Sequence, residues 1–450
     1  MKTRLMLASA MIAGSVFADL PSVSDVRLVQ GADSADITIS YTLKNGPAVI
    51  TLSIETNGPS GWQPLNGRHL WKTTGDVWGE VSGDREHTIV WQPDLVLGNL
   101  KNPSGTVRAV VSAWALDDTP DYLVLDLGVS SVRRRTYYPD EDYLPGGILS
   151  NKMYRSSVLV MRRIHAKGVT WTMGSGENEI GRANNEVPHE VTLDHDYYIG
   201  VFPVTQAQAG RFYYSPSLQP RFLKDGMMRP MEFDCNYYMM RASGPGNGGA
   251  TTSYAYPDAP LSTSWVGYFA GRTGITDLDL PSEAEWEYAC RAGHGDNQWG
   301  DGSPYLMTSD DKTTDANLPG RYRYNQADTT LKDAPAANVG KVMGPTNYTA
   351  IVGSYGKNSW GVYDMHGNIG EWCLDWYQAD ISHLTKGEVN ANGQKYADGT
   401  NVTDLKRVIR GGSWGEAANA CRSAARSYAT QDTRTTCKVG FRLACRAGLN

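Results

Sequence analysis

Two carboxylates, Asp364 and Glu371, stand seven positions apart in a glycine-containing segment, DMHGNIGE, which is suited to binding a hard cation. Ca²⁺ takes about six to eight oxygen ligands from carboxylates and backbone carbonyls, and a tight loop lets several of them converge. The sequence therefore predicts a structural calcium site in this segment. The alternative is that Asp364 caps a turn while Glu371 forms a buried ion pair with an arginine such as Arg442.

The N-terminal residues 1–18 have the pattern of a secretory signal peptide. Lys2 and Arg4 precede an apolar run over residues 5–16, and a small-residue cleavage site ends at Ala18. No later segment has the ~18 uninterrupted apolar residues of a membrane-spanning helix. We therefore expect a chain without a transmembrane segment that is exported to the periplasm, the cell surface or the medium.

The charges of the chain exclude one class of partner. Its 42 Lys and Arg residues and 48 Asp and Glu residues are interspersed and give a net charge of −6. Proteins that bind nucleic acid usually carry a basic stripe or patch, and none is present here. We therefore expect no nucleic-acid partner.

All the cysteines lie beyond residue 230, at Cys235, Cys290, Cys373, Cys421, Cys437 and Cys445. An even number gathered in one part of an exported chain favours structural disulfides, and none forms the CxxC pair of a zinc site. His366 has no serine or cysteine nucleophile at a spacing that would recruit it as a base. His189 and His195 do not make a zinc signature either.

The N-terminal third predicts strands. Apolar residues alternate in several short runs between residues 19 and 128, as at Ile37, Ile39, Tyr41 and Leu43, with turn residues between the runs. This pattern predicts a β-sandwich of immunoglobulin or fibronectin type. Residues 129–155 combine charge runs with turn residues and predict a linker.

Residues 156–447 predict an α+β domain with few regular elements and long ordered loops. Residues 159–164 have the apolar character of a strand. One helix is well marked, because Ser282 can cap it, Glu285 can complete a capping box and Gly293 can end it.

Six motifs follow one another along this second domain. They are TMGS at 172–175, EVPHEV at 186–191, YIG at 198–200 with PVTQ at 203–206, LPSEAEWEYACRAG at 280–293, WGVYDMHGNIGEWCLDWY at 360–377, and RGGSW with GFRLA between 410 and 444. In this order they resemble the formylglycine-generating enzyme family, whose members are sulfatase-modifying factors. The resemblance covers roughly residues 158–447 and implies a modified C-type-lectin fold.

The resemblance also implies which residues would bind calcium. Relatives bind structural Ca²⁺ through the side chains that match Asp364 and Glu371 and through the main-chain oxygens that match Gly367 and Ile369. A second family calcium site maps near residues 317–318, where the following GRYRYN departs from the family pattern.

The catalytic motif of the family is incomplete. Sulfatase-activating members place a closely spaced pair of cysteines after the GGS turn and use it for copper-assisted oxidation of a substrate cysteine. Residues 415–420 contain no cysteine, and no second cysteine stands at that spacing from Cys421. The Ser413 hydroxyl cannot replace two thiolates as a copper ligand. We therefore do not expect copper as a cofactor.

The same relatives have a disulfide between the positions that match Cys290 and Ser423. Cys421 lies two residues before Ser423, and on a strand such positions face the same side. This comparison predicts a Cys290–Cys421 disulfide, which would leave no reactive thiol near the family's active site.

Three hypotheses of function follow. The first is a non-catalytic member that binds a protein, peptide or glycan through its C-terminal lectin-like surface. This segment also resembles the variable proteins of diversity-generating retroelements, and rigid ends around variable positions are typical of binding surfaces. The second is an oxidase acting on sulfatase cysteines, and the third is a structural envelope or matrix protein. The missing cysteines favour the first, with Ser413, Trp414, Glu416, Asn419, Tyr428 and Gln431 as candidate ligand-binding residues.

Overall fold

The computed structural model describes residues 19–31, 34–93, 106–128, 135–212, 227–232, 235–241, 258–306, 319–320, 322, 349–390, 406–431, 433 and 438–448. The predicted signal peptide at residues 1–18 and the second calcium position at residues 317–318 lie outside the described residues.

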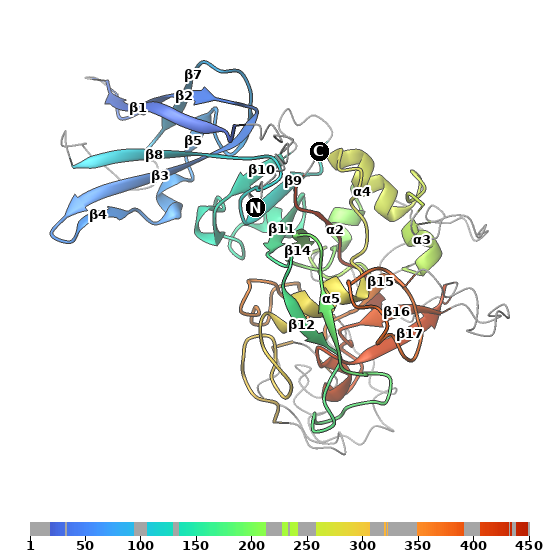
Figure 1. Ribbon diagram of the computed structural model, residues 1–450. Helices are drawn as coiled ribbons and strands as arrows, with labels where there is room; N and C mark the ends of the chain where they lie inside the picture. The colour runs from blue at the N-terminus through green and yellow to red at the C-terminus, as the bar shows by residue number, and fades with distance from the viewer. Residues whose placement is uncertain are drawn as a thin grey trace, which may run out of the picture.

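Two antiparallel sheets form the N-terminal part, which projects from the rest of the molecule (Figure 1). One has the order β1-β2-β7-β5, with β1 at Ser22–Gln30, β2 at Ile37–Lys44, β7 at Glu86–Trp91 and β5 at Thr73–Gly75. The other contains β4 (Gly61–Pro64), β3 (Ala48–Gly58) and β6 (Gly79–Val81), with β8 (Val107–Trp114) paired to β3.

Both sheets contribute to one apolar core, as the alternation predicts. Ile37, Ile39, Tyr41 and Leu43 on β2 are fully buried and share the core with residues of β3 and β7. The expectation of packed β-strands in this part is therefore confirmed. The immunoglobulin type of the arrangement stays a prediction.

The predicted linker differs from the structure. β9 (Tyr122–Asp126), which the prediction placed in the first domain, pairs with β11 (Val158–Ile164) of the second. β10 (Arg135–Tyr138), in the predicted linker, pairs with β9. This four-residue strand is too short to stand out between charged residues, but its adjacent Tyr137 and Tyr138 are both buried. This stretch therefore begins the second domain and does not separate the two.

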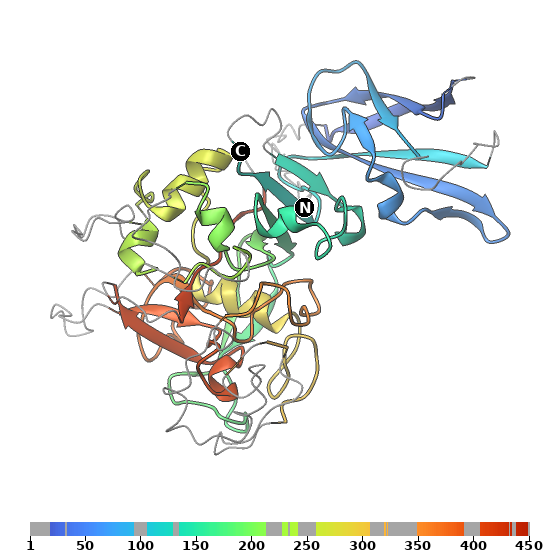
Figure 2. The ribbon, with the colours of Figure 1, turned by 180° about the vertical axis from the view of Figure 1, so that it is seen from behind.

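A five-stranded sheet in the order β10-β9-β11-β14-β19 lies on the side of the second domain next to the N-terminal sheets (Figure 2). β14 spans Tyr197–Gly200 and β19 spans Ala444–Arg446. A separate hairpin joins β12 (Thr170–Met173) to β13 (His189–Thr192). A four-stranded sheet follows, in the order β17 (Arg426–Thr430), β16 (Lys406–Arg410), β15 (Gly370–Trp376) and β18 (Val439–Gly440).

The helices are short. The α-helices are α2 (Gln206–Ala209), α3 (Tyr237–Arg241), α4 (Trp265–Thr273) and α5 (Glu283–Arg291), and the 3₁₀-helices are η1 (Gly67–Leu70), η2 (Glu141–Tyr143), η3 (Lys152–Arg155) and η8 (Ala418–Cys421). α5 confirms the predicted helix: Ser282 and Glu285 form the full capping box, and Ala292 and Gly293 end it with positive φ angles. None of the helices within the described residues is long and apolar enough to cross a membrane.

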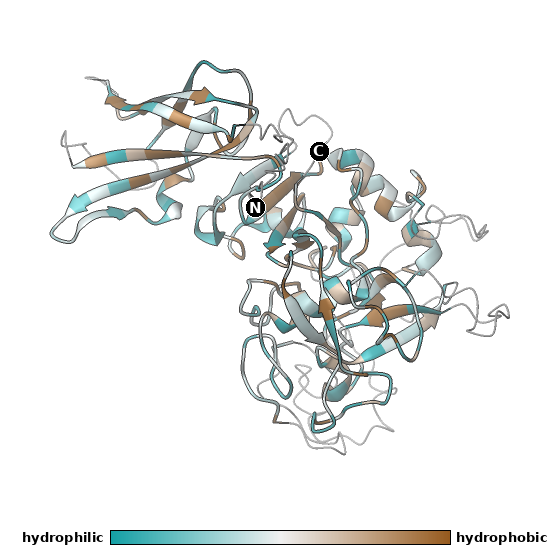
Figure 3. Cartoon of the chain, viewed as in Figure 1, coloured by the Kyte–Doolittle hydropathy of each residue, from teal (hydrophilic) through white to brown (hydrophobic). Residues whose placement is uncertain are grey.

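The α5 helix joins the two sheets of the second domain. Its Trp286 and Ala289 are fully buried and pack with Ile199 of β14 and Val408 of β16. Hydrophobic colour accordingly concentrates on the inner strands, whereas the loops around them are mostly hydrophilic (Figure 3). The segment that carries the candidate ligand-binding residues, after β16, is thereby fixed to a rigid core.

Candidate functional site

A tight turn connects β16 to the segment that carries the candidate ligand-binding residues. Gly411 and Gly412 have φ angles of 94° and 65°, a region that residues with a Cβ atom rarely adopt. A Cβ atom at Gly412 would lie 2.6 Å from the carbonyl oxygen of Ala420 and 2.8 Å from Sγ of Cys421. The chain therefore folds back tightly against η8 here, and both positions need glycine.

Four candidate ligand-binding residues lie in this turn and in η8. Ser413 and Trp414 are buried, and the Trp414 N–H donates to the Asn368 carbonyl over 3.1 Å. Glu416 and Asn419 are half-buried. Ser413 and Trp414 therefore hold the loop in place, whereas Glu416 and Asn419 reach the surface.

Tyr428 and Gln431 lie at a distance from this group. β17 runs antiparallel to β16, so that Arg426 faces Arg410 and Thr430 faces Lys406. Gln431 follows Thr430 and is thus near the start of β16, while the GGSW turn is at its end, about 13 Å away along four strand residues. The structure therefore separates the six predicted residues into two groups.

Tyr428 is part of a stack of rings and cations. Its ring lies 4.2 Å from that of Tyr377, and Lys406 Nζ lies 4.6 Å from the Tyr428 ring centre. The Arg426 guanidinium lies 5.1 Å from the Tyr377 ring centre. Tyr428 still exposes 44% of its surface. This stack presents an exposed aromatic ring and an adjacent ammonium group on the outer strand of the sheet.

A buried cluster of polar side chains lies behind the GGSW turn. Cys290 Sγ is 3.5 Å from Ser423 Oγ and 3.7 Å from Nε2 of His366. The Gly300 N–H donates to Nε2 of His366 over 2.9 Å, so Nδ1 carries the hydrogen and donates to the Cys421 carbonyl. Burial lowers the pKa of His366 to about 4 and raises the pKa of Cys290 to about 12. At neutral pH this cluster holds a neutral imidazole and a protonated thiol, which is a poor nucleophile.

The predicted Cys290–Cys421 disulfide is absent from the structure. Cys290 is a thiol that faces Ser423, and the Cys421 thiol donates to the Ala417 carbonyl. The prediction treated residues 421–423 as a strand, but Cys421 ends the 3₁₀-helix η8, so positions two apart do not share a side. Ser423, which matches the bridging cysteine of relatives, therefore occupies the place opposite Cys290.

Asp364 lies in the loop predicted to bind calcium. It is 2% exposed, and its φ angle is 58°. One carboxylate oxygen accepts the Gly353 N–H over 2.7 Å, and the other accepts the Asn368 side-chain amide over 3.2 Å. Burial raises the pKa of Asp364 to about 6. Within the described residues no lysine, arginine or histidine forms an ion pair with Asp364, and no group of three or more His, Cys, Asp or Glu side chains is placed to hold a metal ion.

Glu371 has cationic and neutral partners in the structure. Its carboxylate accepts hydrogen bonds from Nη2 and Nε of Arg442 over 2.8 and 3.0 Å, and from the Trp286 indole over 2.7 Å. The ion pair with Arg442, named above as the alternative, is therefore present. Three donors leave a carboxylate room for one further contact. The carbonyl of Gly367 accepts from the Ile369 N–H over 2.9 Å.

Sequence reasoning missed a set of buried ion pairs around the C-terminal segment. Arg422 binds Glu179 over 2.6 Å and Glu186 over 2.7 Å, and all three side chains are almost fully buried. Arg426 binds Glu283 at the start of α5 over 2.7 Å. Nothing in the sequence marks these arginines and glutamates as partners, because each pair joins residues more than a hundred positions apart. These pairs fix the C-terminal segment to α5 and to the loop before β13.

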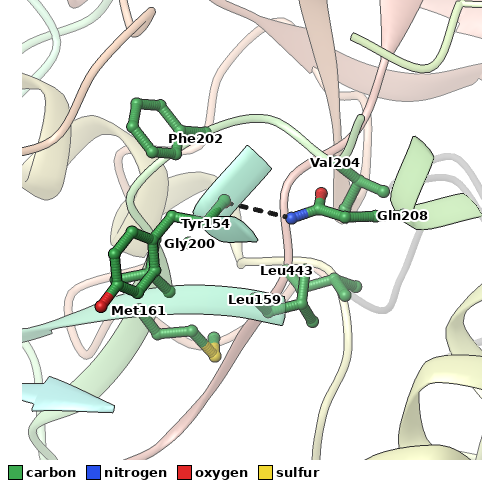
Figure 4. Close-up of a pocket in the computed structure, with 9 residues that line it drawn as sticks. Tyr154, Leu159, Met161, Gly200, Phe202, Val204, Gln208 and Leu443 are labelled. Atoms are coloured by element: carbon green, nitrogen blue, oxygen red, sulfur yellow. Dashed lines mark hydrogen bonds between the residues drawn. The ribbon is translucent and has the colours of Figure 1, made fainter. Parts of the chain in front are cut away.

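The pocket shown in Figure 4 lies elsewhere, between η3, β11 and β14. It has room for about one water molecule, which is too little for an organic ligand. Its walls include Tyr154, Leu159, Met161, Phe202 and Gln208, and the Gln208 amide donates into this region to the Tyr154 carbonyl.

Comparisons with known proteins show which family this chain belongs to. Residues 160–447 match the sulfatase-modifying factor enzyme 1-like domain. The formylglycine-generating enzyme of Streptomyces coelicolor is 33% identical over 175 residues, which are 38% of this chain and 47% of that protein. The formylglycine-generating enzyme of Thermomonospora curvata is 32% identical over 195 residues, which are 42% of this chain and 53% of that protein. The chain thus spans about half the length of these curated relatives.

Among solved structures, PvdO from Pseudomonas aeruginosa has a TM-score of 0.46 at 22% identity, covering 64% of this chain and 94% of that one. Treponema denticola variable protein 1 has a TM-score of 0.41 at 23% identity, covering 65% of this chain and 96% of that one.

Proposed function

This chain belongs to the sulfatase-modifying factor family, and from that premise we propose that it is a non-catalytic member that binds a protein, peptide or glycan. The observation that carries the proposal is the lack of thiolates where the family's catalytic cysteines would lie. Residues 415–420 contain no cysteine, and the nearby Cys290 thiol is fully buried with its pKa raised to about 12. Copper-assisted oxidation needs thiolates as ligands, and this donor set does not fit copper.

The binding surface of the proposal combines the two groups of candidate residues. None of Glu416, Asn419, Tyr428 and Gln431 is buried, and each is attached to a segment fixed by ion pairs or strand pairing. Polar and aromatic side chains on such a rigid base can contact a ligand without large ordering costs. Export, expected from residues 1–18, and calcium at Asp364 belong to the same proposal.

The first experiment tests for catalysis. We expect the purified protein, supplied with copper, oxygen and a cysteine-bearing sulfatase peptide, to leave the peptide mass unchanged. Formylglycine production that is lost in Cys421→Ser would instead establish the oxidase, which the names of the curated relatives favour.

The second experiment tests for binding. A panel of immobilised glycans and peptides would be probed with the wild type, with Tyr428→Ala and with Glu416→Ala. Val169→Ala is a matched control, because Val169 is 42% exposed and precedes β12, outside the proposed surface. Loss of a ligand in the first two variants but not in the control would support the proposal. If all variants retain the ligand, the binding site lies elsewhere on the protein.

A further inference from the structure

β17 is the end strand of the four-stranded sheet, whose order β17-β16-β15-β18 can be followed in Figure 1. Among the described strands it pairs with β16 alone, so its other edge has no partner strand there. An edge strand presents backbone N–H and C=O groups that another extended chain can bind. Whether β17 can do so depends on the direction and the exposure of these groups.

The ladder between β15 and β16 fixes the direction of the backbone groups on β16. Trp376 faces Arg407, and the Tyr377 N–H donates to the Lys406 carbonyl over 2.9 Å. A bond between residues that flank a facing pair means that the pair itself exchanges no bond on this side. The N–H and C=O of Arg407 therefore point away from β15 and toward β17.

The ladder between β16 and β17 extends this alternation to the outer strand. Arg407 faces Ala429, so these two residues exchange the hydrogen bonds of their pair. Backbone groups point to alternate sides along a strand, and those of Tyr428 therefore point to the outer edge. Neither its N–H nor its C=O bonds another described residue. Tyr428 thus presents one donor and one acceptor at the edge of the sheet.

Solvent reaches this part of the edge. The side chains of Ser427 and Tyr428 are both exposed, that of Tyr428 by 44%. The edge ends in a turn at Thr430, since the Thr433 N–H donates to the Thr430 carbonyl over 3.1 Å. The open stretch is therefore short and centred on Tyr428, which suits a bound segment of a few residues.

The side chains beside the edge favour an acidic residue in such a segment. Lys406 Nζ lies 4.6 Å from the Tyr428 ring centre. A residue that faces Tyr428 from an added strand would have its Cβ atom about 5 Å from that of Tyr428, on the same face of the sheet. A carboxylate on that residue would come close to the Lys406 ammonium, and such opposite charges attract each other.

We propose that the outer edge of β17 binds an extended peptide with an acidic residue, which joins the sheet as a further strand at Tyr428. The inference rests on the proposed function, because Tyr428 belongs to the ligand surface, and it narrows the ligand to a peptide segment. The Tyr428 N–H and C=O supply the backbone bonds, and the Lys406 ammonium selects the acidic side chain.

The direction of the Tyr428 N–H is tested without a ligand. Proline lacks the N–H and is tolerated in an edge strand where that group faces solvent. We expect Tyr428→Pro to have a thermal midpoint close to that of Tyr428→Ala. Ala429→Pro, the matched control, should have a much lower midpoint or fail to fold, because its N–H bonds β16. Equal losses in the two proline variants would overturn the proposal.

Peptide binding is tested with the acetylated and amidated hexapeptide Thr-Val-Glu-Val-Thr-Val, titrated into the full chain. We expect saturable binding and slower hydrogen exchange of the Tyr428 amide, because an added strand would bond that N–H. Lysine in place of glutamate in the peptide should weaken binding by at least about tenfold, since it brings a like charge to Lys406. Lys406→Gln should remove this preference and keep the protection of the amide.

The outcomes separate this inference from the proposed function. If a glycan depends on Tyr428 and Glu416 while the hexapeptide leaves the Tyr428 amide unprotected, the proposed function stands and the peptide site is overturned. If no ligand of the panel depends on these residues, the proposed function fails, whereas protection of the amide by the hexapeptide would still support the peptide site. A wild-type dimer that Tyr428→Pro converts to a monomer would assign the edge to a second copy of the chain and overturn the assignment to a peptide.

Discussion

The thiol of Cys290 lies 3.5 Å from the hydroxyl of Ser423, between α5 and the segment that follows η8. Both side chains are buried, with 0% and 2% exposure. A disulfide at this place in relatives would fix the same two segments to each other. Here that connection depends on packing and on the ion pairs of Arg422 and Arg426.

Ser423→Cys should restore the covalent link. The new thiol would face Cys290, and closing a loop of 133 residues restricts the unfolded chain, so we expect about 2–4 kcal/mol of added stability after oxidation. Thiol titration and denaturant unfolding, with and without reductant, provide the measurement. In the control, which combines Ser423→Cys with Cys290→Ser, oxidation should leave the free energy of unfolding unchanged. If oxidation of the single variant does not lower its number of titratable thiols by two, the geometry is unsuitable for a disulfide.

Removing Arg422 should be costly. Its guanidinium binds Glu179 and Glu186 in the interior, and Arg422→Ala would leave two buried carboxylates without a cation. We expect a loss of about 3–5 kcal/mol in the free energy of unfolding. Arg108→Ala is the control, because the Arg108–Glu55 pair is exposed and should contribute at most about 1 kcal/mol. Similar losses in both variants would argue against a special role for the buried pairs.

Calcium should stabilise the second domain through Asp364. We expect a saturable rise of the thermal midpoint with Ca²⁺, reversed by a chelator, because a cation would offset the burial of this carboxylate. Asp364→Asn should remove the response. Asp375→Asn, which alters another buried carboxylate outside the loop, should retain it. A wild-type thermal midpoint that changes with neither Ca²⁺ nor the chelator would rule the site out.

His195 should make stability depend on pH. Burial lowers its pKa, but hydrogen bonds and charge from Glu285 and Asp194 outweigh this and raise the pKa above 6.5. Because the folded pKa exceeds the unfolded one, the contribution is complete below pH 6.5 and is lost as the pH rises through the folded value. Stability in this range should therefore fall with rising pH.

His195→Gln should flatten that dependence in denaturant unfolding measured across the range. His294→Gln serves as its control, since the His294 ring bonds the Ser359 hydroxyl and not a carboxylate. An unchanged slope in His195→Gln would assign the effect to another group.

Local patterns were sufficient for some elements. The alternation at Ile37 and Leu43 and the capping box of Ser282 and Glu285 depend on neighbours within a few residues, and both are present. The linker prediction failed because β9 and β10 are defined by pairing with β11, a contact that composition does not reveal.

The candidate site shows the same division. The motifs identified the family and the GGSW turn, whose glycines are required by backbone geometry. The resemblance implied that Cys290 lies opposite the position of Ser423, but it could not reveal that Cys421 ends a 3₁₀-helix and donates to the Ala417 carbonyl instead of reaching Cys290.

The order of strands in the five-stranded sheet has a consequence for how the protein is made. β9 begins at Tyr122, and β19, which pairs with β14 in the same sheet, ends at Arg446. During translation, more than three hundred residues must be added after the start of β9 before the last strand of the sheet is available. Such long-range pairing slows folding. Among the described strands, β1 to β8 pair only with one another, so this pairing can form while the rest of the chain is still being synthesised.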